Sequence, residues 1–141
     1  MILLDTNVVS EPMQVTPNAG VVAWLDGQAV ETLFLSAITV AELRFGVAVL
    51  PEGKRREGLR SRLEETLLPL FGDRILPFDL EASAAFARLM AAARARGEAI
   101  GKADGFIAAT AVAQGLAVAT RDAAPFRAAG VTVINPWETG N

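Results

Sequence analysis

MILLDTNVVSEP, residues 1–12, places a short apolar strand directly before a carboxylate and two further polar side chains. Ile2, Leu3 and Leu4 are enough for a brief buried strand, and Asp5 stands at its end. Burying a charged carboxylate without a partner is costly, so the pattern favours one of two structures. Either Asp5 caps the next helix, or it is held at the strand end because something positive binds there.

The amino-acid composition limits the chemistry that the chain can perform. Its 141 residues contain no cysteine, no histidine and no tyrosine. Disulfides, thiolate chemistry and the usual zinc ligands are therefore excluded, and any metal should be a hard cation held by oxygens, with Mg²⁺ or Mn²⁺ the natural candidates. The net charge of −3 is not a global signature of nucleic-acid binding, although a local basic patch can still serve.

Length and hydropathy predict a compact protein. With 52% apolar and 21% charged residues, the chain is expected to form one domain over residues 1–141. The N-terminus lacks the basic region of a signal peptide, and no stretch approaches the roughly 20 apolar residues that a membrane span requires. We therefore expect a cytoplasmic protein that has no membrane partner.

Short β-rich segments alternate with segments of helical spacing along the chain. The expected strands are MILL, TLFLS, RILPF, LAVAT and VTVIN. The expected helices are GVVAWLDG, ITVAELRFGVAVL, a leucine-rich helix from Gly53 that ends at Pro69 and Gly72, EASAAFARLMAAARARG, ADGFIAATAVAQG and APFRAAG. This alternation predicts an α/β fold with a mainly parallel central sheet flanked by helices on both faces.

The large aromatic side chains stand at apolar positions of these segments. Core positions are therefore expected for Trp24, Phe34, Phe45, Phe86 and Phe106. For Trp137, in the C-terminal PWETGN segment, two interpretations remain open, namely packing on the domain and contact with a neighbouring molecule.

Four acidic residues fall at positions where ligands gather in α/β sheets. Asp5 and Asp122 follow the first and fourth expected strands. Glu42 lies one turn into the helix after TLFLS, and Asp104 opens the alanine-rich helix. Ligands of open α/β sheets bind outside the carboxyl ends of the strands, so all four acids are expected to face one crevice.

Each acid also has a purely structural interpretation. Asp5 and Asp104 are suitable helix N-caps, Asp122 can cap APFRAAG, and Thr39 with Glu42 matches a capping box. Any one acid alone is more often a cap, but four at one end of a sheet favour a cation site, because close carboxylates repel one another without a cation. A divalent ion can activate water for phosphodiester hydrolysis, which then needs no histidine.

Four ordered motifs complete the pattern: MILLDTNVVSE, LSAITVAELRFGV, GKADGFIAATA and LAVATRDAAPF, followed by VINPW. Together they resemble the PIN-domain ribonuclease toxins of the VapC type, in particular their FitB-like branch, over essentially the whole chain. The resemblance implies a PIN-like three-layer α/β/α fold. It also implies a Mg²⁺- or Mn²⁺-dependent endoribonuclease that is the toxin component of a type II toxin-antitoxin system.

The resemblance assigns roles to individual residues. The catalytic acids of the family match Asp5, Glu42, Asp104 and Asp122. Asp5 and Asp104 are expected to bind the first metal ion, and Glu42 and Asp122 to complete the acidic pocket or hold a second ion. Supporting hydrogen bonds are implied for Thr6, Asn7 and Thr120. Many relatives carry another acid three residues after the position of Asp122, where this chain has Pro125.

The same resemblance implies partners. They are a cognate antitoxin of the ribbon-helix-helix type, operator DNA contacted only through that antitoxin, an RNA substrate, and a second copy of the chain in a homodimer. Candidate RNA contacts are Lys54, Arg55, Arg56 and Arg60 on the leucine-rich helix, with Lys102 near Asp104. A solvated helix face explains the basic run equally well, and Lys102 can equally balance the local negative charge.

Two other functions fit parts of the pattern. A phosphatase of the haloacid-dehalogenase kind also begins with a strand that ends in aspartate, but it requires a second acid two positions later, where this chain has Asn7. The second is a non-catalytic module that completes a DNA-binding antitoxin complex, with its acids acting only as helix caps. This alternative predicts that metal ions leave the stability of the protein unchanged.

Overall fold

The computed structural model describes residues 1–138, so the last three residues of the expected domain 1–141 lie outside the described residues. One sheet of five strands runs in the order β3-β2-β1-β4-β5, and each neighbouring pair is parallel. The strands are β1 (Ile2–Leu4), β2 (Leu33–Ser36), β3 (Ile75–Leu76), β4 (Ala117–Ala119) and β5 (Val133–Ile134). The parallel sheet predicted from the sequence is confirmed.

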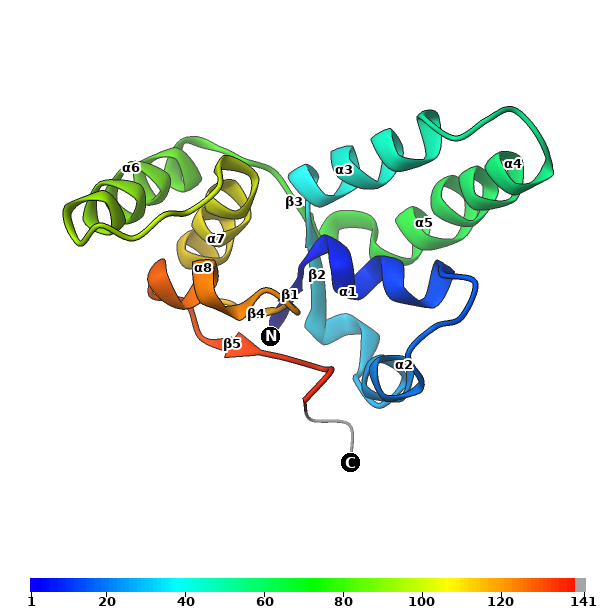
Figure 1. Cartoon of the computed structure of the whole chain (residues 1–141), viewed down its shortest axis with the longest axis horizontal. Helices are drawn as coiled ribbons and strands as arrows, with labels where there is room; N and C mark the ends of the chain where they lie inside the picture. The colour runs from blue at the N-terminus through cyan, green and yellow to red at the C-terminus, as the bar shows by residue number, and fades with distance from the viewer. Residues whose placement is uncertain (139–141) are drawn as a thin grey trace.

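Helices cover both faces of this sheet (Figure 1). One face carries α1 (Thr6–Ser10), η1 (Glu11–Met13), α2 (Ala19–Asp26), α3 (Ala37–Ala48), α4 (Lys54–Ser61), the π-helical segment η3 (Arg62–Leu67) and α5 (Leu68–Phe71). The other face carries α6 (Leu80–Ala95), α7 (Lys102–Gln114) and α8 (Ala123–Ala128). Two 3₁₀ turns, η2 (Val30–Thr32) and η4 (Gly72–Arg74), precede β2 and β3. Within residues 1–138, no helix combines the length and apolar character of a membrane span.

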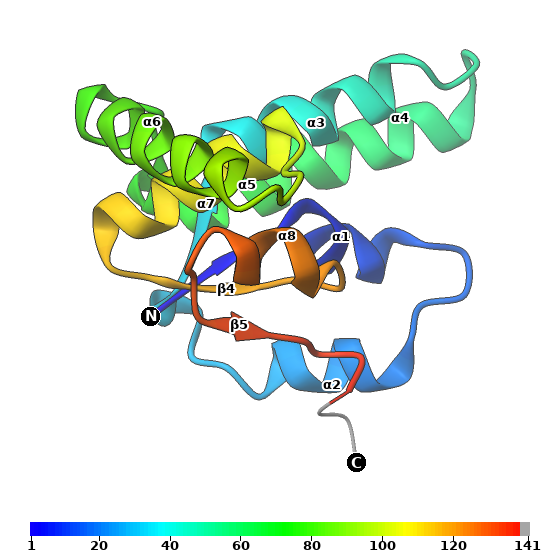
Figure 2. The ribbon, with the colours of Figure 1, turned by 60° about the vertical axis from the view of Figure 1, so that its left-hand side comes forward.

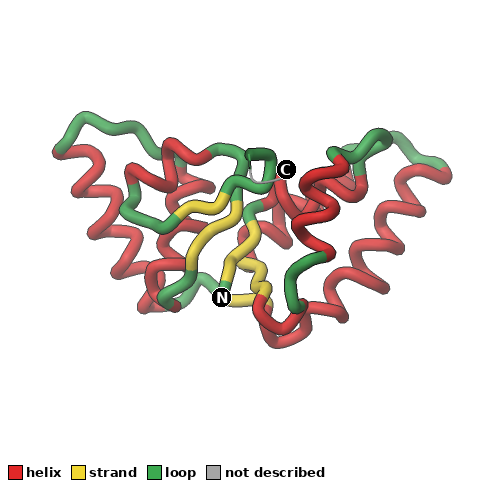
Figure 3. The backbone as a smooth tube through the Cα atoms, turned by 90° about the horizontal axis from the view of Figure 1, so that it is seen from below, coloured by secondary structure: helices red, strands yellow, loops and turns green. Residues whose placement is uncertain are grey.

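Consecutive strand residues point to opposite faces of the sheet, and this alternation separates two hydrophobic cores. Leu3 and Val118 belong to the core shared with α6, α7 and α8. Leu4 and Ala119 belong to the core shared with α1, α3 and α5. The strands therefore form the middle of three layers, as Figure 3 shows from below, and the predicted α/β/α architecture is confirmed.

β1 lies at the centre of the sheet, at the point where the strand order reverses. β2 and β3 extend from it to one side, whereas β4 and β5 extend to the other. The Asp5 backbone N–H donates to the Ala119 carbonyl at 2.9 Å, which holds the ends of β1 and β4 side by side. Such a reversal point leaves a crevice beyond the carboxyl ends of the strands, and the residues after β1 and β4 border it.

The leucine-rich helix ends at Gly72, as predicted, but not at Pro69. Leu63, one of the leucines of its apolar stripe, is buried. The helix passes through Pro69 and stops at Gly72, whose φ is 52°. The Leu68 N–H donates to the Leu63 carbonyl five residues earlier, which is the spacing of a π-helix. This wider turn stands directly before Pro69, where a regular helix would need an N–H that proline lacks.

Phe45 is wrongly predicted as a core residue, because its side chain is 69% exposed. Val49, one turn later at the C-cap of the same helix, is 62% exposed. Periodic spacing marks a helix face as apolar but does not say whether that face meets the core. By contrast, Phe86 stacks on Phe106 with ring centroids 4.6 Å apart, and Trp137 packs against the core on the α1 side.

α6 and α7 approach each other closely at Gly105. A β-carbon at this position would lie 2.8 Å from Met90 Sδ and 3.1 Å from Phe86 Cε2. A glycine in a helix interior is normally unfavourable, so the close contact explains why one is present here. Gly46, in the interior of α3, has open space around it instead.

These two glycines give a matched test of the α6–α7 contact. Gly105→Val is expected to lower the free energy of unfolding by about 1–3 kcal/mol, because the added methyl groups overfill the contact. Gly46→Ala is expected to raise it by about 0.5–1 kcal/mol through helix propensity. Urea denaturation of both variants measures the difference. A Gly105→Val variant as stable as the native protein would contradict the contact.

Candidate active site

Asp5 is a buried carboxylate at the end of β1, with only 4% of the residue exposed. One side-chain oxygen accepts the Thr6 N–H and the other accepts the Thr120 hydroxyl, each at 2.8 Å. Burial raises the pKa of Asp5 from 3.8 to about 6, which outweighs the opposite effect of these two hydrogen bonds. The negative charges of Asp104 and Glu42 raise it further. The two hydrogen bonds therefore fix the position of the carboxylate, but they do not offset the cost of burying its negative charge.

The other three acids surround Asp5 from different elements. Asp104 stands in the first turn of α7, and its pKa is raised first by burial and then by the charges of Asp122 and Glu42. Glu42, on α3, and Asp122, after β4, are exposed. Burial is the larger cause of both pKa shifts, but each also contains contributions from neighbouring acids, and these contributions link all four carboxylates into one electrostatically coupled group.

Helix capping explains only one of these acids. α7 is capped by Gly101, so Asp104 lies inside the helix. Ser36 caps α3 by accepting the Thr39 N–H at 3.0 Å, and the capping box expected between Thr39 and Glu42 is therefore wrong. Asp122 occupies the N-cap position of α8, but its side chain makes no capping hydrogen bond. Asp5 does cap α1 through the Thr6 N–H.

A chain of hydroxyl groups positions Glu42. The Thr6 hydroxyl donates to Glu42 Oε1 at 2.6 Å, and Thr6 Oγ1 lies 3.2 Å from Thr39 Oγ1. The Ser36 hydroxyl donates in turn to Thr39 Oγ1 at 3.3 Å, and both residues are fully buried. Sequence reasoning missed Ser36 and Thr39 as supports of the site. The available signal was a pair of hydroxyl side chains where the strand TLFLS runs into a helix.

Thr120 and Asn7 join the ends of β1 and β4. Thr120 Oγ1 donates to Asp5 and accepts the Asp122 N–H at 3.0 Å. Asn7 Nδ2 lies 3.5 Å from Asp122 Oδ2, and Asn7 Oδ1 accepts the Arg121 N–H at 3.2 Å. Each polar residue that the sequence singled out, Thr6, Asn7 and Thr120, thus contacts one of the four acids.

The basic residues are divided between two places. Lys102 begins α7, two residues before Asp104, and is exposed. The other four, Lys54, Arg55, Arg56 and Arg60, lie on α4. Arg56 and Arg60 line a recess of about 310 Å³ beside Val47 and Ala48, at the far end of α3 from the acids. Arg60 also pairs with Glu57 at 3.1 Å, so part of this positive charge is already balanced.

The chemistry of the donor set decides which metal ion the acids can hold. All the donors are carboxylate oxygens, and among residues 1–138 none of the ion pairs involves Asp5, Glu42, Asp104 or Asp122. Within the same residues, no three carboxylates are gathered closely enough to hold a metal ion by themselves. Carboxylate oxygens are ligands that a hard cation such as Mg²⁺ takes, one or two at a time with several water molecules, so it is the type of donor that fits such an ion.

A sequence model of the PIN domain matches residues 2–131. The chain belongs to the PIN-domain family. It is 61% identical to VapC ribonuclease Y4jK of Sinorhizobium fredii, over 98% of this chain and 99% of the relative. It is 56% identical to toxin FitB of Neisseria gonorrhoeae, over 97% of this chain and 99% of the relative. These relatives confirm the resemblance to VapC-type toxins and to their FitB-like branch.

The fold agrees with the same assignment. The solved structure of FitAB bound to the IR36 DNA fragment superposes with a TM-score of 0.97 at 52% sequence identity, and the match covers 100% of this chain and 99% of the solved one. Likeness at this level extends over the sheet, both helical layers and the segments that carry the four acids.

Removing the charge of Asp5 is expected to stabilise the metal-free protein near neutral pH. The folded-state pKa of about 6 lies above the ordinary 3.8. The free energy of unfolding therefore falls as the pH rises from about 4 to about 6, and the full cost of ionising Asp5 in the folded protein is reached above that range. The shift corresponds to at most about 3 kcal/mol, partly offset in Asp5→Asn because the new amide nitrogen cannot accept a hydrogen bond.

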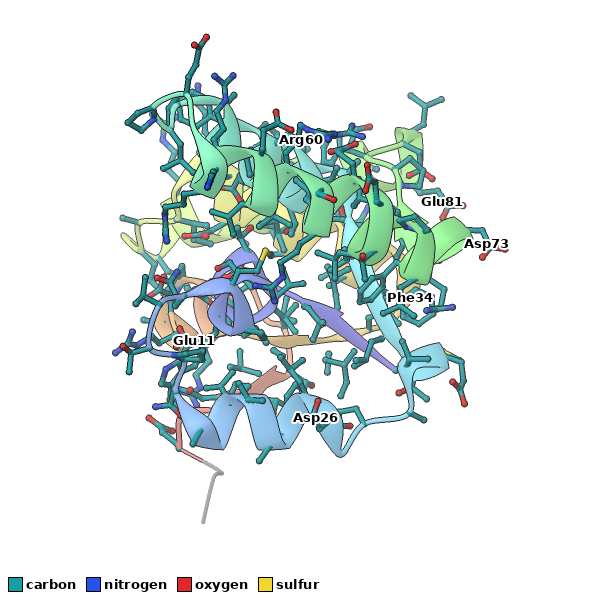
Figure 4. The ribbon with its side chains drawn as sticks, turned by 90° about the vertical axis from the view of Figure 1, so that its right-hand side faces the viewer. Glu11, Asp26, Phe34, Arg60, Asp73 and Glu81 are labelled. Carbon is teal, nitrogen blue, oxygen red and sulfur yellow. The ribbon has the colours of Figure 1, made fainter. Side chains whose placement is uncertain are left out.

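Thermal unfolding in chelator measures this effect. Asp5→Asn should melt above the native protein at about pH 7, and the difference should shrink towards zero at about pH 4. Asp73→Asn, which changes an exposed acid in η4 (labelled in Figure 4), is the control and should have no comparable effect. An Asp5→Asn variant that melts below the native protein at both pH values would contradict an uncompensated charge at Asp5.

Proposed function

We propose that the protein is a metal-dependent endoribonuclease of the VapC type, the toxin of a type II toxin-antitoxin system, which hydrolyses RNA phosphodiesters in the cytoplasm. One observation carries the proposal: four coupled acids, without ion pairs among residues 1–138, stand where the strand order of the sheet reverses. The identity of 61% to a VapC ribonuclease supports RNA as the substrate.

Asp5 and Asp104 are the proposed ligands of Mg²⁺ or Mn²⁺, with Glu42 and Asp122 available as further ligands. A divalent ion supplies a Lewis acid that polarises a phosphoryl oxygen and makes a water molecule more acidic. Asp5 suits the role of principal ligand because two hydrogen bonds fix its carboxylate. Hydrogen-bonded partners of this kind orient ligands and maintain their affinity for metal.

The exposed acids can serve the reaction itself. Because the chain contains no histidine, a carboxylate is the proposed acceptor of the proton from the attacking water. Glu42 is oriented for this by the Thr6 hydroxyl, and Asp122 is oriented by its backbone N–H bond to Thr120. Lys102, at the start of α7 near Asp104, is placed to contact a phosphate of the substrate.

The proposed partners each have support in the structure. An apolar cavity of about 390 Å³ between η1, α2 and α5 suits a segment of a ribbon-helix-helix antitoxin; its lining includes Val9, Met13, Leu25, Leu67 and Phe71. Operator DNA would be contacted through the antitoxin, since the net charge of −3 gives this chain no basic footprint of its own. The exposed Phe45 on α3 and the exposed Val49 at its C-cap support a homodimer.

RNA phosphates are also proposed to contact α4 through Lys54, Arg55, Arg56 and Arg60. Such contacts would position the strand without reading its sequence. Because α4 packs beside the far end of α3, these contacts would involve phosphates away from the bond that is cleaved.

A second function is favoured by one observation. Within residues 1–138 no group of three carboxylates is close enough to hold a metal ion by itself, which agrees with a non-catalytic module that acts only in a DNA-binding antitoxin complex. The two functions differ in their response to metal. An ion that binds only the folded state stabilises it, by about 2.7 kcal/mol when its concentration is a hundred times the dissociation constant.

Cleavage of a mixed structured RNA by the purified protein tests the ribonuclease. Cutting is expected with Mn²⁺ and not with chelator, and Asp104→Asn should slow it by about a hundredfold or more, because losing a direct ligand exceeds the effect of losing a ligand's supporting partner. Asp73→Asn is the matched control and should cut normally. Equal cutting by Asp104→Asn and the native protein would place the activity elsewhere.

Thermal unfolding with and without Mn²⁺ separates the two functions independently of the substrate. The ribonuclease predicts a higher melting temperature with Mn²⁺, and a smaller increase in Asp5→Asn and Asp104→Asn. An unchanged melting curve of the native protein, together with no cutting of RNA, would favour the non-catalytic module.

A further inference from the structure

A polar recess of about 480 Å³ lies beside Asp122, to which its lining residue Asn7 is hydrogen-bonded, and the proposed hydrolysis does not use it. It lies between the end of α1 with η1 and the segment that follows β5. In Figure 2 this segment runs on from β5, below β4, towards the C-terminus. Glu11, labelled in Figure 4, marks its α1 side. We call it the Trp137 recess; its lining includes Asn7, Glu11, Gln14, Thr16, Arg121 and Trp137.

Asn7 connects this recess directly to the acids. Its side chain lines the recess, while Nδ2 lies 3.5 Å from Asp122 Oδ2 and Oδ1 accepts the Arg121 N–H at 3.2 Å. Arg121 itself immediately precedes Asp122 in the chain. A group bound in the recess would therefore be the immediate neighbour of a group bound at the acids.

The recess contains a cation–π pair. The Arg121 guanidinium lies 5.1 Å from the centroid of the Trp137 ring. Arg121 is exposed, and within residues 1–138 no carboxylate forms an ion pair with it. The Trp137 backbone N–H donates to Asn135 Oδ1 at 3.0 Å, and the Trp137 ring packs against the core. Trp137 is therefore held in a fixed position beneath Arg121.

The remaining residues that line the recess offer both hydrogen-bond donors and hydrogen-bond acceptors. Glu11 accepts the Asn18 N–H at 2.8 Å, which fixes its carboxylate beside the recess. Gln14 and Thr16 supply an amide and a hydroxyl. Unpaired RNA bases are recognised by this combination, because their faces stack on aromatic rings or guanidinium planes and their edges present donors and acceptors.

We propose that the Trp137 recess holds the base of an unpaired RNA nucleotide next to the phosphate that is cleaved, with the base stacked on the Arg121–Trp137 pair. This inference rests on the proposed ribonuclease function and gives it a substrate class. A duplex keeps its bases paired and stacked inside, so the recess selects single-stranded or looped RNA. Binding here requires no cation, unlike binding of the phosphate among the acids.

Steady-state cleavage by the full chain tests the recess, with a single-stranded RNA of about ten nucleotides and the same RNA annealed to its complement. Trp137→Leu and Arg121→Ala should each raise KM for the single strand about tenfold or more without a comparable fall in kcat. Trp137→Phe keeps a stacking ring and should retain most of the affinity. Arg94→Ala removes an exposed positive charge on α6 and should change neither constant.

Fluorescence in chelator measures binding without cleavage. The chain has two tryptophans, so single-stranded RNA should quench part of the emission of the native protein, and this quenching should be lost in Trp137→Phe, which retains Trp24. Because Trp137 also packs against the core, thermal unfolding must first show that Trp137→Leu is folded. Arg121→Ala alters an exposed side chain and keeps the test valid if Trp137→Leu does not fold.

Three results would overturn the inference. Native KM and kcat in folded Trp137→Leu and in Arg121→Ala would remove the recess from substrate binding and leave the ribonuclease intact. Absence of quenching by RNA, with quenching by a peptide from the antitoxin's C-terminal segment, would assign the recess to the partner protein. If the native protein cuts no RNA, the proposed function fails, and an absence of quenching would then overturn base binding as well.

Discussion

The buried negative charge of Asp5 is the constraint on which the site depends. A carboxylate that is only 4% exposed needs hydrogen-bond donors, and the fold supplies one from the start of α1 and one from the end of β4. Because the Thr120 hydroxyl also accepts the Asp122 N–H, the same contact fixes the chain beyond β4. A pKa of about 6 shows that these donors do not fully compensate the burial. The fold thus maintains a strained charge where a binding site is proposed, as functional sites commonly do.

The order of the strands explains how residues from distant parts of the chain meet this charge. In a parallel sheet every strand ends at the same edge, and helices that start at this edge present their first turns to it. Glu42 reaches the site from the helix after β2, and Asp122 from the turn after β4. Asp104 stands on the helix before β4, so its position depends on how closely α7 packs against α6 at Gly105.

The fold was largely predictable because strand ends, helix spacing and turn glycines are local features of the sequence. The positions of Asp5, Glu42 and Asp122 followed from strand order, since each lies near the start of a connection, whereas Asp104 opens the helix that leads back into β4. Helix starts were less predictable: Ser36 and Gly101 begin α3 and α7 earlier than expected, which removes Glu42 and Asp104 from capping positions. The exposed Phe45 and the π-helical turn before Pro69 depend on tertiary contacts that spacing does not encode. The same holds for Arg121 and Trp137, which meet only because β5 carries the chain back past α1.

The proposed substrate poses an electrostatic problem that this arrangement can solve. RNA is a polyanion, whereas the site is a group of coupled carboxylates in a protein of net charge −3. A divalent cation offsets the repulsion at the phosphate that it contacts, but salt screens the remaining charge of the acids only beyond roughly 8 Å at physiological ionic strength, so the adjacent nucleotides are still repelled. The neighbouring nucleotides must be bound by other means. Stacking on Arg121 and Trp137 is suited to this, since attraction between flat faces does not depend on the charge of the acids. On this view the acids determine where the strand is cut, and the adjacent recess keeps an unpaired strand in place against their repulsion.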